Sequence, residues 1–334
     1  MRVAVAGLGW WGKQIVRSLH PSTKLDVVCG VDPYPPPDAR AFTSEFSIDL
    51  ETSLDAVLRR ADVDGVILAT PHSLHEEQVL AVVRAGKEVF CEKPLAMTGD
   101  SARRMLDAVD GAGRVLGIGH ERRFEPAVME IFRMVRAGEL GRLLHLEANI
   151  SHDLFRNVRS DNWRLDPEHA PAGLMTAVGI HVTDIFVALA GPARSVRAVT
   201  DSMVLSPPAQ DYVSATIDFA SGARGTLTFL SATPFHGRMA IFGDRGWVEL
   251  VSEGNVDKGK PTILTTCFST DGPWQRRVFA ANDAVLANLE AWADGVAKRA
   301  TYPFPRAELS GNVELFEAIV RSAGSGGATV TLAG

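Results

Sequence analysis

Residues 2–32 read RVAVAGLGWWGKQIVRSLHPSTKLDVVCGVD, and this stretch decides the fold. A short valine-rich run is followed by a glycine-rich loop, a segment with apolar residues at helical spacing, and a second apolar run that ends in Asp32. We assign these segments, in order, to residues 3–6, 7–12, 13–19 and 25–31. The order strand, glycine loop, helix, strand and acid predicts the first unit of a doubly wound parallel sheet.

The glycine loop has the spacing G-x-G-x-x-G, in which each glycine has a separate function in dinucleotide binding. Gly7 permits a tight turn, Gly9 lets a pyrophosphate approach the backbone, and Gly12 lets the helix pack closely. Asp32, about 20 residues on, is placed to bind ribose hydroxyls. We expect the loop to hold the cofactor through Gly7, Leu8, Gly9, Trp10, Trp11 and Gly12. An ordinary glycine-rich turn is the alternative.

Composition limits the class of protein. A chain of 334 residues suits two domains. The net charge of −6 argues against a nucleic-acid or anionic-membrane partner. Three cysteines without C-x-x-C spacing fit reduced thiols in the cytoplasm. Because the first strand begins at residue 3, we expect no signal peptide, and no apolar run approaches the ~18 residues that span a bilayer.

Alternating strands and helices continue after Asp32. We expect strands at 46–48, 65–69, 87–91 and 114–119, and helices at 38–44, 50–60, 75–85 and 98–111. The sequence therefore predicts an α/β fold with a six-stranded, doubly wound parallel sheet. Ligands of such sheets bind at the carboxyl ends of the strands, where Gly7, Asp32, Thr70, Glu92 and Gly119 fall.

Three of these strand ends carry further motifs. Residues 70–75 read TPHSLH, residues 85–94 read AGKEVFCEKP, and residues 120–126 read HERRFEP. Together with the glycine loop, they resemble the Gfo/Idh/MocA family of glucose–fructose oxidoreductase and inositol dehydrogenase, over most of the first 190 residues. The resemblance implies an NAD(P)-binding Rossmann domain and oxidoreductase activity. It adds cofactor contacts at Thr70, Pro71, His75, Glu92 and Lys93.

The remaining chain fits the second domain of that family. After a helix at 124–137, the expected strands lie at 143–150, 213–219, 224–229, 239–242 and 247–251, and late helices at 283–299 and 306–322. We predict a Rossmann domain over 1–121 and an α+β substrate-binding domain with a large, mostly antiparallel open sheet over 122–334. The resemblance implies that the open face makes a homodimer or homotetramer.

Two residues are candidates for proton transfer. Lys93 ends a strand beside the predicted cofactor site, where its ammonium can hold a developing alkoxide; a solvated lysine is the alternative. His181 matches the histidine of the family pattern G-G-x-x-x-D-x-G-x-H-x-x-D, although Ala172 replaces its first glycine and Ala177 its first aspartate. We expect Asp184 to orient the His181 imidazole, and a buried structural histidine is the alternative.

Substrate contacts are expected at Glu121 and Arg122 as well as at Lys93 and His181, whereas a surface ion pair is the alternative for Arg122. Trp163 and Arg164 resemble a pair that reaches the nicotinamide half of the cofactor, and a core residue is the alternative for Trp163. We expect no metal site.

These patterns predict hydride transfer between NAD, in preference to NADP, and a secondary alcohol or ketone of a cyclic polyol, sugar or dihydrodiol. A non-catalytic NAD-binding sensor or co-regulator, and an NAD-assisted elimination like that of the family's glycosidases, are the alternatives.

Overall fold

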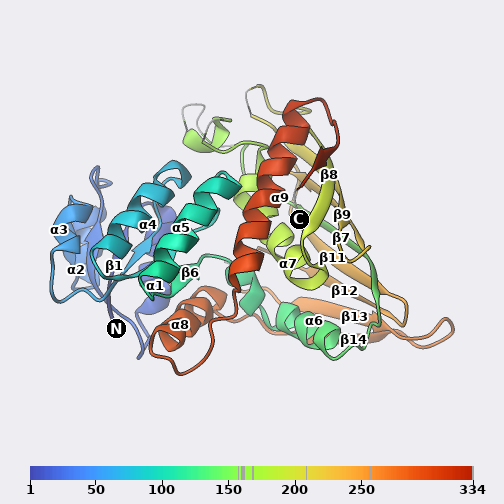
Figure 1. The fold of residues 1–334 in the computed structure, drawn as a ribbon, viewed down its shortest axis with the longest axis horizontal. Helices are drawn as coiled ribbons and strands as arrows, with labels where there is room; N and C mark the ends of the chain where they lie inside the picture. The colour runs from blue at the N-terminus through green and yellow to red at the C-terminus, as the bar shows by residue number, and fades with distance from the viewer. Residues whose placement is uncertain (157, 159–161, 168, 208, 256–257, 333–334) are drawn as a thin grey trace. The chain divides into compact units, whose positions relative to one another are not determined.

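The computed structural model describes residues 1–156, 158, 162–167, 169–207, 209–255 and 258–332 (Figure 1). The chain forms two compact units. The first contains Met1–Glu121 and Asp283–Leu309, and the second contains Arg122–Asn282 and Ser310–Gly334. We placed the division after residue 121, but assigned residues 283–309 to the second domain, whereas they pack with the first.

The first unit contains a six-stranded parallel sheet in the order β3-β2-β1-β4-β5-β6. Its strands are β1 (Arg2–Ala6), β2 (Asp26–Val31), β3 (Asp49–Glu51), β4 (Gly65–Leu68), β5 (Glu88–Cys91) and β6 (Leu116–Ile118). The intervening helices are α1 (Trp10–Leu19), α2 (Ala39–Glu45), α3 (Leu54–Leu58), α4 (His75–Arg84) and α5 (Gly99–Gly111). The predicted doubly wound sheet is confirmed, and β4 is buried along its whole length, as expected for a strand covered on both faces.

The segment between α2 and β4 differs from the prediction. We expected a strand at 46–48 and a helix at 50–60, whereas β3 lies at 49–51 and α3 is shorter than predicted. Ser47 has a φ of 55°, in the left-handed region, so the chain turns there instead of extending. The helix begins only after Ser53, whose hydroxyl oxygen accepts a hydrogen bond from the Ala56 amide.

Helix α8 (Ala284–Val296) completes the core of the first unit, although its residues come late in the sequence. Trp292 has no exposed surface, and its indole N–H donates to the Val115 carbonyl at 3.0 Å. Asn288, also buried, donates to the Ile118 carbonyl at 2.7 Å. We expected the chain after residue 280 to pack on the second domain, and this prediction is wrong for α8, because its apolar face is buried against β6 and α1.

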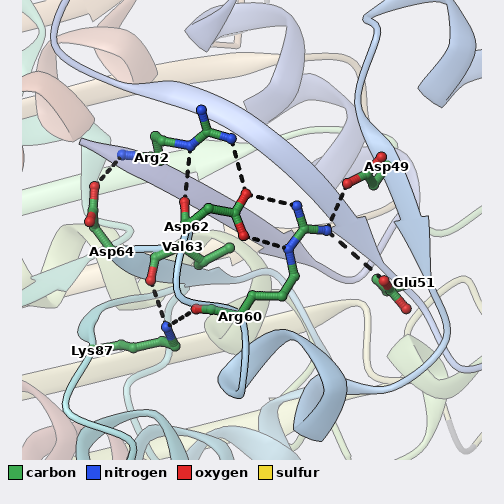
Figure 2. Close-up of polar contacts among 8 residues, drawn as sticks. All are labelled: Arg2, Asp49, Glu51, Arg60, Asp62, Val63, Asp64 and Lys87. Carbon is green, nitrogen blue, oxygen red and sulfur yellow. Dashed lines mark hydrogen bonds and ion pairs between the residues drawn. The ribbon is translucent and has the colours of Figure 1, made fainter.

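Charged side chains join the loops at the amino-terminal ends of the parallel strands (Figure 2). The Arg60 guanidinium binds Asp62 at 2.9 Å and Asp49 at 2.7 Å. Nearby, the buried Lys87 ammonium donates to the carbonyl oxygens of Arg60, at 2.7 Å, and Val63, at 2.6 Å. Lys87 therefore ties the start of β5 to the loop that leads into β4, at the edge of the sheet opposite the glycine loop.

The second unit contains a nine-stranded sheet in the order β14-β13-β12-β11-β7-β10-β9-β8-β15. Its pairs are antiparallel except for β7 with β10. The strands are β7 (Leu143–Ser151), β8 (Ala193–Asp201), β9 (Tyr212–Phe219), β10 (Arg224–Leu230), β11 (His236–Gly243), β12 (Trp247–Ser252), β13 (Thr262–Cys267), β14 (Gln275–Phe279) and β15 (Val330–Thr331). The mostly antiparallel sheet is as predicted.

Helices α6 (Pro126–Arg136), α7 (Ile180–Ala190) and α9 (Arg306–Gly324) lie on one face of this sheet (Figure 1). Apolar residues of the strands alternate onto that face; in β10, for example, every second residue is buried. The opposite face carries polar groups, including Arg238, which binds Glu147 and Glu249 at 2.5 Å. On the same face, Phe242 pairs with Trp247 and Arg238 pairs with Val251, so apolar residues share this open face with the ion pairs.

We predict that Lys87→Met lowers the free energy of unfolding by about 2–3 kcal/mol, because two buried carbonyl groups lose their donor. The exposed neighbour of Arg60 in the sequence provides a matched control: Arg59→Met should change that free energy by less than about 0.5 kcal/mol. Urea unfolding of both variants measures the difference. Equal stability of Lys87→Met and the wild type would show that the two hydrogen bonds of Lys87 contribute nothing to the free energy of unfolding.

Candidate cofactor and catalytic site

The glycine loop has the geometry that dinucleotide binding requires. Gly7 has a φ of 92°, and a β-carbon there would lie 2.4 Å from the Ala69 carbonyl oxygen. A β-carbon on Gly12 would lie 1.8 Å from the Gly7 carbonyl oxygen. At Gly9, in contrast, a β-carbon would have no described atom within 4 Å. Two glycines therefore permit tight packing, and the third borders open space at the start of α1, where a pyrophosphate fits.

Asp32 is held next to this loop. Its Oδ2 accepts a hydrogen bond from the Leu8 amide and its Oδ1 accepts one from the Tyr34 amide, both at 2.9 Å. A carboxylate oxygen has two lone pairs, so each oxygen retains the capacity to accept from a ribose hydroxyl. The residues present therefore fit a dinucleotide.

The other loop residues differ in exposure. Helix α1 begins at Trp10, which is 62% exposed, and the ring of Trp11 lies 5.3 Å away and is half-buried. The Leu8 side chain is fully buried and packs against Gly30. Leu8 therefore faces the opening only with its backbone, whereas Trp10 presents its ring to the surface of the first unit.

Thr70, Pro71 and His75 follow β4. Thr70 is half-buried and donates from its hydroxyl to Gln78, and Pro71 is exposed. His75 is fully buried: its Nδ1 lies 2.7 Å from the Pro94 carbonyl oxygen and its Nε2 lies 3.1 Å from that of Thr70. Burial lowers the pKa of the His75 imidazole. The resemblance implied a cofactor contact for His75, and the structure shows its ring enclosed between two backbone carbonyls.

Glu92 and Lys93 end β5. Burial raises the pKa of the Glu92 carboxyl, and the Trp11 indole and the Lys93 ammonium act in the opposite direction. Glu92 packs on Gly119, where a β-carbon would lie 2.3 Å from Oε2, and this oxygen accepts from the Lys93 amide at 3.2 Å. The Lys93 side chain is half-buried, and the bond to Pro94 is cis. Lys93 therefore lies at the same strand edge as Asp32 and the glycine loop.

In the second unit, a π-helical turn at Met175–Gly179 leads directly into α7. Such turns are frequent at functional sites. Ala172, which replaces a family glycine, has a φ of 56°, in the left-handed region that favours glycine. The replacement therefore strains the backbone just before the segment that carries His181.

Asp184 is bound by a buried arginine. Arg123 donates from Nε to Oδ2 and from Nη2 to Oδ1 of Asp184, each at 2.6 Å, and both side chains are buried. We expected Asp184 to orient His181, which is itself buried; each Asp184 oxygen bound to Arg123 keeps a second lone pair, so this role stays a prediction. Our sequence reasoning missed Arg123 as a functional residue; the signal was its place beside Arg122 in the 120–126 motif.

Arg122 is also buried and bound. It donates to Glu125 at 3.1 Å and to Asn255 at 2.7 Å, and burial raises the pKa of the Glu125 carboxyl. Arg122 and Glu125 line a pocket with Phe235 and apolar residues of the sheet and α7. Glu121, which ends the first unit, is buried as well.

Arg164 lies in the 3-10 turn Trp163–Leu165 and lines a second, smaller pocket of the second unit with Phe155 and Gln210. Burial lowers the pKa of its guanidinium. The side chain of Trp163 is outside the part that the structure describes.

Within the described ranges, no three histidine, cysteine, aspartate or glutamate side chains are grouped so that they could hold a metal ion. No helix in the same ranges combines the length and the apolar character that crossing a bilayer requires.

Family models match both units. The model described as an oxidoreductase family with an NAD-binding Rossmann fold matches residues 1–120, and the model of the GFO/IDH/MocA C-terminal domain matches residues 128–249.

Curated relatives span most of the chain. It is 31% identical to a 1,5-anhydro-D-fructose reductase of Ensifer adhaerens over 254 residues, 73% of each protein. It is 32% identical to an inositol 2-dehydrogenase of Klebsiella pneumoniae over 296 residues, 86% of this chain and 84% of the relative. Among solved structures, an aldose-aldose oxidoreductase from Caulobacter crescentus has the same fold, with a TM-score of 0.86, 24% identity and 99% coverage of both chains.

The contrast between Gly9 and Gly12 gives a testable prediction. Gly9→Ala should leave the free energy of unfolding within about 0.5 kcal/mol of the wild type, yet weaken NAD binding about tenfold or more, because the new methyl group fills the space for the pyrophosphate. Gly12→Ala should instead destabilise the protein, by roughly 2 kcal/mol or more, because its methyl group meets the Gly7 carbonyl. Calorimetric titration and urea unfolding measure both. Undiminished NAD affinity in Gly9→Ala would place the pyrophosphate elsewhere.

Proposed function

Because the chain belongs to the Gfo/Idh/MocA family of oxidoreductases, we propose that it transfers a hydride between a nicotinamide cofactor and a secondary alcohol or ketone of a cyclic polyol, sugar or dihydrodiol. One observation carries this proposal: the open space at Gly9, the Asp32 carboxylate and Lys93 lie at one edge of one sheet. The sugar and polyol relatives support the substrate class.

The cofactor supplies the hydride acceptor or donor. In our proposal, the loop amides and the start of α1 bind its pyrophosphate, and Asp32 binds the adenine ribose. Thr70, Pro71 and Glu92 border its nicotinamide half from the first unit. Trp163 and Arg164 are further proposed contacts of that half, by resemblance alone.

Lys93 and His181 assist proton transfer in this proposal. The His181 imidazole accepts the proton of the substrate hydroxyl, or returns it in the reverse reaction. The Lys93 ammonium stabilises the alkoxide that forms. Ala177 supplies no carboxylate, and the Asp184 charge is neutralised by Arg123. We infer that the substrate has fewer hydroxyl groups toward residue 177 than a fully hydroxylated polyol. Glu121 and Arg122 complete the proposed substrate contacts.

We also propose a homodimer or homotetramer in the cytoplasm, formed through the open face of the second unit's sheet. That face carries ion-paired groups, such as Arg238 and Glu147, together with apolar residues, such as Phe242, which favours an interface that combines ion pairs with apolar burial.

A non-catalytic NAD-binding protein is the second candidate function, and Ala177 favours it, because the family aspartate beside the catalytic histidine is missing. Such a protein would bind NAD and oxidise nothing in a broad panel of polyols, sugars and dihydrodiols. We favour the enzyme because Lys93 and His181 are both present.

Lys93→Ala should lower turnover by roughly 100-fold or more while the dissociation constant for NADH stays within about threefold, because the ammonium acts on the substrate and not on the pyrophosphate. Steady-state assays with the best substrate of the panel, together with NADH fluorescence titration, separate the two quantities. His20→Ala, at an exposed histidine of the same unit, is the matched control. Full activity of Lys93→Ala would remove this residue from the mechanism.

Cofactor choice is predicted by Asp32. NAD(H) should bind more tightly than NADP(H), because a 2′-phosphate would meet the Asp32 carboxylate, and Pro33 and Tyr34 offer it no positive charge. Both dissociation constants are measured at one salt concentration. Asp32→Asn, which removes only the charge, should narrow the difference, and tighter binding of NADP(H) by the wild type would refute the assignment.

A further inference from the structure

His75 joins two segments that carry functional residues. Its Nδ1 lies 2.7 Å from the Pro94 carbonyl oxygen, in the segment after β5, and its Nε2 lies 3.1 Å from the Thr70 carbonyl oxygen, in the segment after β4. These strands are neighbours in the sheet, and both segments lie at its ligand-binding edge. His75 opens α4 and is fully buried, so its ring lies beneath this edge and has no surface with which to contact a ligand.

The protonation state of the His75 imidazole decides to how many carbonyl oxygens it can donate a hydrogen bond. A neutral imidazole has one N–H, so it donates to only one of the two carbonyl oxygens. Burial lowers the pKa of the His75 imidazole and outweighs the hydrogen bonds to the backbone, which raise it, so we take the ring as neutral. The Nδ1 contact, at 2.7 Å, is shorter than the Nε2 contact, at 3.1 Å, so we take Nδ1 as the donor, to the Pro94 carbonyl.

The Lys93 backbone is therefore held from both sides. On one side, the Lys93 amide donates to Glu92 Oε2 at 3.2 Å, and the Glu92 carboxylate is itself packed on Gly119. On the other side, the carbonyl of the next residue, Pro94, accepts from His75. A small displacement of a catalytic group lowers the reaction rate by a large factor. A fixed backbone at Lys93 therefore helps to keep the rate high.

We propose that His75 is a positioning residue for Lys93, acting through the Nδ1–H bond to the Pro94 carbonyl, and that it makes no contact with the cofactor. This inference rests on the proposed function, in which the Lys93 ammonium stabilises the alkoxide. It replaces the cofactor contact that the sequence resemblance implied for His75.

Three substitutions test the inference. The amide nitrogen of Asn lies close to the position of Nδ1, whereas that of Gln reaches the position of Nε2, and Ala removes both donors. We expect His75→Asn to keep kcat within about threefold of the wild type, and His75→Gln and His75→Ala to lose roughly 10- to 100-fold. The dissociation constant for NADH should stay within about threefold in all three, and His20→Ala should resemble the wild type throughout.

Several outcomes would overturn the inference. The first is that His75→Gln keeps kcat and His75→Asn does not. The second is that NADH affinity falls in parallel with kcat. The third is that kcat is unchanged in every variant. A merely structural role would lower the melting temperature without this separation between kcat and NADH affinity. If His75→Ala does not fold, the comparison of Asn with Gln decides.

A second measurement does not depend on turnover. Hydrogen exchange in the peptide that covers residues 92–96 should be about tenfold faster in His75→Ala than in the wild type and His20→Ala, because the segment loses its anchor. Unchanged exchange there would refute the role of His75. If the wild type oxidises no compound of the panel, the proposed function fails, and the exchange result still decides whether His75 holds the Lys93 segment.

Discussion

The close approach of Gly12 to the Gly7 carbonyl oxygen is the constraint on which the first unit depends. A β-carbon would lie 1.8 Å from that oxygen, so α1 leaves the loop at an angle that only glycine permits. The same loop is tied to the end of β2, because the Gly7 amide donates to the Val31 carbonyl at 2.7 Å and the Leu8 amide donates to Asp32. One loop therefore fixes β1, α1 and the ribose-binding acid together, which is the arrangement a dinucleotide needs.

The core beneath this edge is completed by a helix from a distant part of the chain. Trp292 of α8 fills space beside Gly65 and Gly117, where β-carbons would lie 3.3 Å and 2.9 Å from its ring. The strands of a parallel sheet usually carry branched residues, and these two glycines make room for the indole. The Rossmann unit is thus a product of residues 1–121 and of the late segment 283–309, and neither forms the whole core alone.

Most helices and strands could be predicted because the sequence patterns that indicate them span only a few neighbouring residues. The glycine loop, the apolar strands and the helical spacing each depend on a few neighbouring residues, and the sheet order follows from their alternation. Strand β8 was missed because a register shift between Ala193 and Ser195, and an exposed Val199, break its alternation of apolar and polar residues. The packing of α8 and the pairing of Arg123 with Asp184 depend on residues 61 to 177 positions apart, for which a single sequence has no signal. The sequence therefore indicates which motif residues form the candidate site, but it does not indicate which side chains bind them.

These contacts affect which side chains can take part in the proposed proton transfer. Asp184 binds Arg123 with both carboxylate oxygens, and Ala177 supplies no carboxylate at the family's aspartate position. In our proposal, His181 accepts the proton, and the Lys93 ammonium stabilises the negative charge that develops on the substrate oxygen. The Lys93 segment is the part of the site whose backbone is held on both sides, by Glu92 and by His75. In our proposal, the rate then depends on the exact placement of the Lys93 ammonium, which is the condition under which a buried positioning histidine matters.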